Sequence, residues 1–296
     1  MATFYRRLPR FDYVKPKSLG DALDLLKGNK LGAIQVYAGG TDVIPRLKAR
    51  LLPAPKFLMD LKGLSELDHI EYKDGQGLDI GALATVSSLI QNTLVREQFG
   101  VLFQGANSIA STQVQNRGTL AGNLCNAIPS ADSAPALLCL GAKLVCVSHR
   151  GERRINIENF ITGPRKTILE SDELVKKIHV PDMPAGSRGV YIKLSTRSRM
   201  DLSLVGVAVV VAAVDGVIRD IRIGLGGVAP TTIRAKRAEE MLLGEKVRDN
   251  IIAEGGRLAA EESSPRSSHR ASAEYRRLMV EVLVKRALIQ TLKVQE

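Results

Sequence analysis

The chain has 296 residues, 45% of them apolar, which is enough for a sizeable hydrophobic core in one to three domains. The longest apolar run covers residues 205–214, about half of the roughly 20 residues that a membrane-spanning helix needs, so we expect no transmembrane segment. The net charge of +11 is spread along the chain, without a basic patch interleaved with aromatic residues, so we expect no nucleic-acid partner.

The cysteines limit the metal chemistry that we expect of the chain. Cys125, Cys139 and Cys146 are too few for the four thiolates of an iron–sulfur cluster, and their odd number and irregular spacing do not indicate a disulfide framework. We therefore expect reduced thiols and no metal site, and any iron–sulfur cluster should lie on another chain. The first residues are charged but lack an apolar signal region, which favours a cytoplasmic protein.

The first third of the chain alternates between helix and strand patterns. Ser18 is a good N-cap for an amphipathic helix that Gly28 ends, and Thr85 is a good N-cap for a later one. The predicted strands cover residues 34–38, 57–61 and 78–83. The predicted helices cover residues 19–27, 85–99 and 101–110.

A polar stretch rich in glycine and asparagine runs from Ser111 to Asp132. It is too long to be a single turn, and loops of this length inside compact domains usually carry function. Next come a predicted helix over 134–140 and predicted strands over 143–147 and 173–180. Proline and glycine make residues 181–186 a linker.

The last third follows a different pattern. Two strong β runs, residues 204–214 and 217–225, flank Asp215-Gly216, which predicts a hairpin. Three helical segments follow, over residues 234–243, 249–262 and 271–292. The sequence therefore predicts an α+β fold, with a mixed α/β region over residues 1–180 and a hairpin-plus-helices domain after the linker.

One candidate binding turn is the segment Val-Tyr-Ala-Gly-Gly-Thr-Asp at residues 36–42. The two glycines permit positive φ and a close approach of the backbone, and successive N–H groups there can form a nest for a phosphate. The segment is neither a GxGxxG fingerprint nor a P-loop. By itself the signal is weak, and an ordinary turn after a strand is the alternative.

A second candidate is the segment from Arg117 to Asp132, Arg-Gly-Thr-Leu-Ala-Gly-Asn-Leu-Cys-Asn-Ala-Ile-Pro-Ser-Ala-Asp. It offers hydroxyl and amide groups as neutral donors and acceptors, and its final carboxylate is suited to accept ribose hydroxyls. A solvated surface loop is the alternative. No nucleophile–base pair stands out, and none of the four histidines falls in these segments.

Taken together, the two segments resemble the FAD-binding subunits of the xanthine dehydrogenase and carbon monoxide dehydrogenase family, which carry an Ala-Gly-Gly-Thr-Asp-type turn and a Thr-(Ile/Leu)-Gly/Ala-Gly-Asn segment followed by Pro-Ser-Ala-Asp at this spacing. Three further segments match in order, so the resemblance covers essentially the whole chain. They are Asn159-Phe-Ile-Thr-Gly-Pro-Arg-Lys-Thr167, Tyr191-Ile-Lys193 with Arg197 and Asp201, and Gly224-Leu-Gly-Gly-Val-Ala-Pro230.

The resemblance implies a two-lobed FAD-binding domain of α/β lobes (PCMH-type) over residues 1–180, with lobes at about 1–57 and 58–180. It also implies a C-terminal domain over 187–296, with a small antiparallel sheet packed on helices. The first turn would place backbone groups along the FAD diphosphate, Asp132 would meet ribose or ribityl hydroxyls, and the charge of Lys193 would favour the reduced, anionic flavin. The implied cofactor-binding residues are Ala38, Gly39, Gly40, Thr41, Asp42, Thr119, Gly122, Asn123, Asn126, Ser130, Asp132 and Lys193.

The function that the resemblance implies is electron transfer within a molybdenum hydroxylase complex. Electrons would pass from [2Fe-2S] clusters of a small partner subunit through FAD to NAD+, a quinone or oxygen, or the reverse in a reductase. A large partner subunit would hold the molybdenum cofactor, and the complex is expected to be a dimer of heterotrimers. No residue of this chain is expected to act as an acid, base or nucleophile, because the flavin itself carries the redox chemistry.

Two alternatives remain open at this point. A stand-alone FAD-dependent oxidoreductase is compatible with a flavin-binding fold, since fold does not fix function, although no separate substrate domain is evident. A basic module without enzymatic activity would show no flavin colour and would bind nucleic acid with a steep salt dependence.

Overall fold

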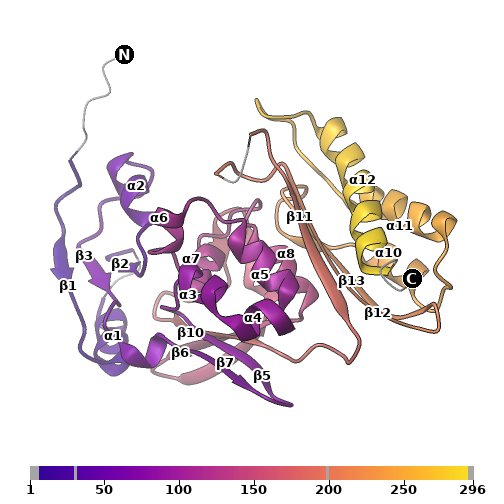
Figure 1. Cartoon of the computed structure of the whole chain (residues 1–296). Coiled ribbons are helices and arrows are strands. Elements are labelled where there is room, and N and C mark those ends of the chain that lie inside the picture. Colours follow the sequence, from indigo (N-terminus) through magenta and orange to yellow (C-terminus); the bar gives the residue numbers. More distant parts are fainter. Residues whose placement is uncertain (1–6, 30–31, 198–199, 293–296) are drawn as a thin grey trace.

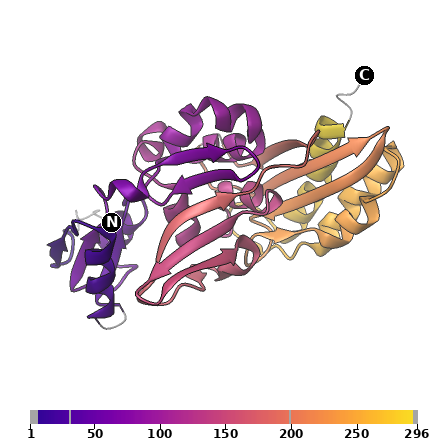
Figure 2. The same ribbon diagram turned by 90° about the horizontal axis from the view of Figure 1, so that it is seen from below.

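The computed structural model describes residues 7–29, 32–197 and 200–292. Three parts lie in a row, each built around its own sheet, with the N-terminal part at one end and the C-terminal sheet and its helices at the other (Figures 1 and 2). The central part holds most of the remaining helices. The α+β prediction is confirmed.

The N-terminal part is a three-stranded parallel sheet of order β1-β3-β2 with two helices. Ser18 and Asp21 form a capping box at the start of the first helix, whose leucines pack against Met59 and its neighbours. The expected lobe limit near residue 57 coincides with the start of the strand that occupies the centre of this sheet. The elements are β1 (Asp12–Val14), α1 (Leu19–Lys27), β2 (Ile34–Tyr37), α2 (Val43–Lys48) and β3 (Phe57–Asp60).

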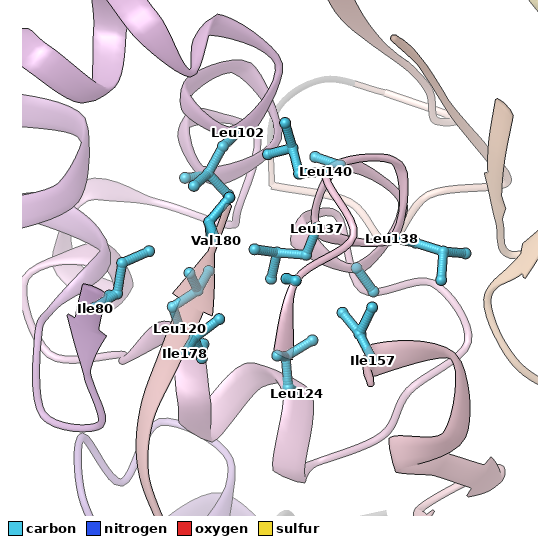
Figure 3. Close-up of a cluster of buried hydrophobic side chains, with 14 of the residues drawn as sticks. Ile80, Leu102, Leu120, Leu124, Leu137, Leu138, Leu140, Ile157, Ile178 and Val180 are labelled. Atoms are coloured by element: carbon cyan, nitrogen blue, oxygen red, sulfur yellow. The ribbon is translucent and has the colours of Figure 1, made fainter. Parts of the chain in front are cut away.

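The central part contains a five-stranded antiparallel sheet of order β4-β5-β10-β6-β7. Its strands are β4 (Ile70–Lys73), β5 (Gly77–Gly81), β6 (Lys143–Ser148), β7 (Gly151–Asn156) and β10 (Leu174–Val180). The short elements η1 (Ser65–Leu67), α9 (Ile157–Phe160), β8 (Ile161–Gly163) and β9 (Lys166–Thr167) connect them. Leucines of the central helices fill the core above Ile80 and Ile178 of this sheet (Figure 3).

The central helices are α3 (Val86–Gln91), α4 (Thr93–Gln98), α5 (Gly100–Asn107), α6 (Thr112–Gln115), α7 (Leu120–Cys125) and α8 (Ser133–Cys139). Two sequence-based predictions in this region are wrong. The predicted helix over 85–99 is interrupted at Asn92, whose side-chain oxygen caps α4 by accepting from the N–H of Val95 at 3.1 Å. The stretch 111–132 is not one loop, because Thr119 caps α7 and Leu120 and Leu124 are buried.

The C-terminal sheet is antiparallel, in the order β11 (Arg188–Leu194), β12 (Val205–Val214), β13 (Val217–Gly226) and β14 (Ile233–Arg234). The predicted hairpin is confirmed: Asp215 and Gly216 both have positive φ, 52° and 71°, as a type I′ turn requires. Three helices cover one face of the sheet (Figure 1). They are α10 (Lys236–Leu242), α11 (Asp249–Glu262) and α12 (Ala273–Leu292).

Strand β12 is buried on both faces, which explains its unbroken apolar sequence. Val207 and Val209 face the three C-terminal helices, whereas Ala208 and Val210 join the core of the central part. There α5 and α8 pack against the sheet. A Cβ on Gly224 would lie 2.6 Å from the carbonyl oxygen of Pro135, so a glycine at this position lets α8 approach the sheet closely.

Candidate functional site

The first binding turn and the second segment touch backbone to backbone. A Cβ on Gly39 would lie 1.9 Å from the carbonyl oxygen of Arg117 and 2.9 Å from Cα of Gly118, so only glycine fits at position 39. A Cβ on Gly118 would in turn lie 3.4 Å from Oγ1 of Thr41. The N–H of Val86 donates to the carbonyl oxygen of Gly118 at 2.8 Å and fixes the second segment on the central part. The two segments thus form one continuous wall.

This wall lines a cavity of about 480 Å³, within the size range of small-molecule and cofactor sites. Of the twelve predicted cofactor-binding residues, all except Lys193 line it. They are Ala38, Gly39, Gly40, Thr41, Asp42, Thr119, Gly122, Asn123, Asn126, Ser130 and Asp132. The tertiary structure therefore brings together residues that lie about eighty positions apart in the sequence.

The first turn presents unused donors to this cavity. Within the described residues, the backbone N–H groups of Gly39, Gly40, Thr41 and Asp42 donate to no protein acceptor. Gly40 adopts a φ of +78°, and a Cβ there would lie 2.2 Å from Cε2 of Tyr37. Successive free N–H groups in a turn with positive φ form a nest suited to a phosphate. The turn therefore fits the diphosphate of FAD.

Two arginines add positive charge beside this turn. Oδ1 of Asn126 accepts from Nη1 of Arg46 at 3.4 Å and from Nη1 of Arg165 at 3.2 Å. The Nε of Arg46 is buried without a hydrogen-bond partner, which fits a missing anionic acceptor. Burial raises the pKa of Asp42, while a hydrogen bond from Asn126 and the charges of Arg165 and Arg46 oppose that shift. Burial lowers the pKa of Arg46, and the charge of Arg165 adds to the effect.

Asp132 is held by the C-terminal domain. Its Oδ1 accepts from the hydroxyl of Tyr191 at 2.8 Å and from the hydroxyl of Ser203, and its Oδ2 accepts from Nζ of Lys193 at 2.8 Å. Lys193 also donates to the carbonyl oxygen of Ser108 at 2.9 Å. Burial, followed by the Asp132 charge, raises the pKa of Tyr191 well above 10. The structure places Lys193 behind Asp132 rather than on the cavity wall.

Tyr191 and Ser203 are site residues to which the sequence analysis gave no role. The signal for Tyr191 was present, because residues two apart on a strand point to the same face and Tyr191 precedes Lys193 by two. Ser203 lies beyond the end of β11, and its contact with Asp132 spans 71 positions of the sequence. No local pattern indicates such a contact.

The remaining polar residues of the second segment support one another. Oγ1 of Thr119 accepts from the N–H of Gly122 at 3.0 Å and so caps α7. Oδ1 of Asn123 accepts from the hydroxyl of Ser133 at 2.7 Å, at the start of α8. These bonds use side-chain oxygens that the sequence offered to a ligand. Thr119, Gly122 and Asn123 all line the cavity.

Three further findings concern the described part of the chain. Among the described residues, no three histidine, cysteine, aspartate or glutamate side chains converge as metal ligands. No helix in residues 7–29, 32–197 and 200–292 is both long and apolar enough to cross a bilayer. Cys125, Cys139 and Cys146 form no disulfide.

A cavity between two α/β lobes, with a glycine-lined anion nest and with residues 200–202 of the loop between β11 and β12 in its wall, defines a flavin-binding subunit of the PCMH type. Residues 9–183 match the FAD binding domain in molybdopterin dehydrogenase, and residues 190–291 match the CO dehydrogenase flavoprotein C-terminal domain. The chain belongs to this family as an FAD-binding medium subunit of a molybdenum hydroxylase, and it is thus an oxidoreductase component. The resemblance seen in the sequence is confirmed.

Individual relatives agree with this assignment over nearly the full length. The chain is 33% identical to the glyceraldehyde dehydrogenase medium chain of Sulfolobus acidocaldarius, over 94% of this chain and 97% of the relative. It is 33% identical to the xanthine dehydrogenase FAD-binding subunit of Escherichia coli O157:H7, over 93% of this chain and 94% of the relative. The solved carbon monoxide dehydrogenase of Hydrogenophaga pseudoflava superimposes with a TM-score of 0.92 at 32% identity, covering 97% and 98% of the two chains.

Proposed function

We propose that this chain carries electrons between the iron–sulfur clusters of a small partner subunit and an external acceptor, in a complex whose large subunit holds the molybdenum cofactor. The acceptor is NAD+, a quinone or oxygen, and in a reductase the flow is reversed. FAD, when bound, supplies the redox centre that exchanges electrons with both sides. The observation that supports this proposal best is that both glycine-containing segments line the same cavity.

In this proposal the first turn holds the diphosphate of the cofactor. The free N–H groups of residues 39–42 donate to its oxygens, the hydroxyl of Thr41 adds a donor, and the buried Nε of Arg46 lies in the same wall. Backbone donors keep their positions whether or not the anion is present, so binding costs little rearrangement. The second segment, from Thr119 to Asp132, lines the cavity beyond the diphosphate.

We assign Asp132 the contact with ribose or ribityl hydroxyls, and Lys193 a positioning role that acts through Asp132. A carboxylate has about four lone-pair directions, and three are taken by Tyr191, Ser203 and Lys193, so one acceptor direction remains for a cofactor hydroxyl. Lys193 orients the carboxylate of Asp132 through their ion pair at 2.8 Å. The resemblance implied a lysine whose charge favours the reduced flavin, and in this assignment Lys193 acts through Asp132.

The assembly is part of the same proposal. The relatives named as medium chains support a heterotrimer of small, medium and large subunits, and we propose two such heterotrimers in the complex. We also propose that residues 1–180 and 187–296 act as the FAD-binding and C-terminal domains, with lobes meeting near residue 57. Three thiols without disulfides fit a reducing compartment, in line with a cytoplasmic location.

The direct test is the absorption spectrum of the complex purified through this chain, with subunit masses and FAD, molybdenum and iron contents. We expect flavin and iron–sulfur bands, one FAD per copy of this chain and two further subunits. Mixing the reduced complex rapidly with NAD+, a quinone or oxygen then identifies the acceptor by the fastest return of the flavin bands. An active, flavin-containing single chain without iron would contradict the proposal, and so would a chain without flavin.

A further inference from the structure

A second cavity of about 480 Å³ adjoins the first and is lined by four arginines. Arg165 comes from the loop between β8 and β9, Arg266 and Arg270 from the loop between α11 and α12, and Arg276 from α12. Among the residues that the structure describes, no aspartate or glutamate lies in its wall. The two cavities share Ile128, Ser130 and Leu202. We call this second space the arginine cavity.

Arg276 gives the strongest indication of an anion site, because its guanidinium is buried and no carboxylate among the described residues pairs with it. Its side chain is 4% exposed, and its guanidinium donates only to neutral groups: the carbonyl oxygens of Leu204 at 2.5 Å and Gly227 at 3.4 Å, and Oγ of Ser268 at 3.1 Å. Its Nε has no partner. Burying an arginine without a carboxylate is costly, so an anion is the expected complement.

The neighbours of Arg276 increase this excess of positive charge. Nε of Arg270 is also buried without a partner, and within the described residues none of the four arginines forms an ion pair with a carboxylate. Burial lowers the pKa of Arg276, and the charges of Arg270 and Arg266 lower it further. Gathering like charges in one cavity destabilises the protein unless an anion is bound between them.

The donors in the wall suit a phosphate group. Oγ of Ser268 accepts from Arg276 and from the backbone N–H of Arg270 at 3.2 Å, which leaves its own hydrogen available to a ligand. Ser264 lines the same wall. A planar guanidinium group can donate two parallel hydrogen bonds to two oxygens of one phosphate. A serine hydroxyl can donate a further hydrogen bond to the same group.

We propose that the arginine cavity binds a phosphate- or diphosphate-bearing anion at a second site beside the flavin cavity. The chemistry of the wall is the same for a free inorganic anion and for the phosphates of a nucleotide. The inference does not depend on where the flavin diphosphate lies, because it rests on the C-terminal arginines alone.

The test is isothermal titration of the FAD-loaded complex with inorganic pyrophosphate and, separately, with ADP at low ionic strength. We expect saturable binding that weakens about tenfold in Arg270→Gln and in Arg266→Gln, the effect of losing one charge-assisted contact. Arg277→Gln is the matched control, since Arg277 is the exposed neighbour of Arg276 on α12 and lines neither cavity. Tighter binding of ADP than of pyrophosphate identifies a nucleotide as the ligand, and equal affinities identify the free anion.

Two results would overturn the inference. One is the absence of saturable binding of either probe, or an equal weakening in Arg277→Gln, which would reduce the effect to general surface charge. The other is the loss of FAD from Arg270→Gln and Arg266→Gln, which would make the arginine cavity part of the flavin site. Because FAD content is measured on the same samples, failure of this inference is distinguishable from failure of the proposed electron-transfer role.

Discussion

Nζ of Lys193 lies 2.8 Å from Oδ2 of Asp132, and this ion pair joins β11 of the C-terminal sheet to the residue that precedes α8. Both side chains are nearly buried, at 9% and 8% exposure. Tyr191 and Ser203 bind the other carboxylate oxygen. The position of Asp132 in the wall of the cavity therefore depends on the docking of the C-terminal domain, and with the proposed role of Asp132 we expect cofactor binding and domain docking to be coupled.

We predict that Asp132→Asn and Lys193→Met each destabilise the protein by about 3–5 kcal/mol, because each breaks a buried ion pair. The double variant should lose clearly less than the sum of the two, since no isolated charge remains. The measurement is the free energy of unfolding in urea for all four members of the cycle. Flavin content should fall in both single variants.

The pair Lys176–Glu152 on the central sheet provides the control, because it lies at the surface outside the flavin cavity and should contribute little. Strictly additive losses at Asp132 and Lys193 would show that the two residues act independently. Normal flavin content in Asp132→Asn would remove Asp132 from the cofactor site.

Gly39→Ala should separate the two binding segments. The added Cβ would meet the carbonyl oxygen of Arg117 at 1.9 Å, and relief of such overpacking costs about 1–3 kcal/mol. We expect FAD content to fall sharply, measured as the ratio of flavin to protein absorbance. Gly100→Ala is the matched control, since a Cβ there meets nothing within 4 Å. Full flavin content in Gly39→Ala would mean that the contact of the two segments is not needed for binding.

Gly40→Val should abolish FAD retention, for a reason that the structure refines. A side chain at position 40 would block the close approach of the backbone to a phosphate that the two glycines permit, and the structure adds a φ of +78° and a clash with the ring of Tyr37. Holding a β-branched residue in this region costs about 1–3 kcal/mol. Gly75→Val is the matched control, because Gly75 has a similar φ of +72° but a Cβ there meets nothing within 4 Å. It should lose similar stability but keep its flavin, and equal flavin loss in both variants would attribute the effect to general unfolding.

The stability of the protein should fall in acid partly through Glu173, which also lines the flavin cavity. Arg153 binds both of its oxygens at 2.7 Å, and the N–H of Glu170 donates to one of them at 2.8 Å. Burial opposes ionisation of Glu173, but these bonds prevail and lower its pKa below the ordinary value of 4.5. Its contribution is therefore complete above pH 4.5 and is lost as the pH falls below that value.

Urea unfolding of Glu173→Gln between pH 3 and pH 7 tests this contribution. The variant should be less stable than the native protein at pH 7, and the difference should shrink towards pH 3. Glu152→Gln removes an exposed partner of Lys176 on the same sheet and should change the profile little. A difference that stayed constant with pH would show that the ionised form of Glu173 does not contribute.

Much of the architecture was evident from local patterns. The capping box at Ser18, the Asp215-Gly216 hairpin and the unbroken apolar run of β12 each follow from interactions within a few residues or from burial on both faces, and all three are found in the structure. The two glycine-containing segments identified the family, because the backbone that must touch a diphosphate tolerates few alternatives at each position.

Tertiary structure alone decided how the segments act together. Nothing near position 39 in the sequence indicates that Gly39 packs against Arg117, and nothing near position 132 indicates that Asp132 is bound by Tyr191, Ser203 and Lys193 from another domain. The arginine cavity is likewise lined by five separate stretches of the chain. The physical reason is that the periodicity of a sequence indicates which face of a helix or strand is buried. The segment that packs against that face is fixed only when the whole chain has folded.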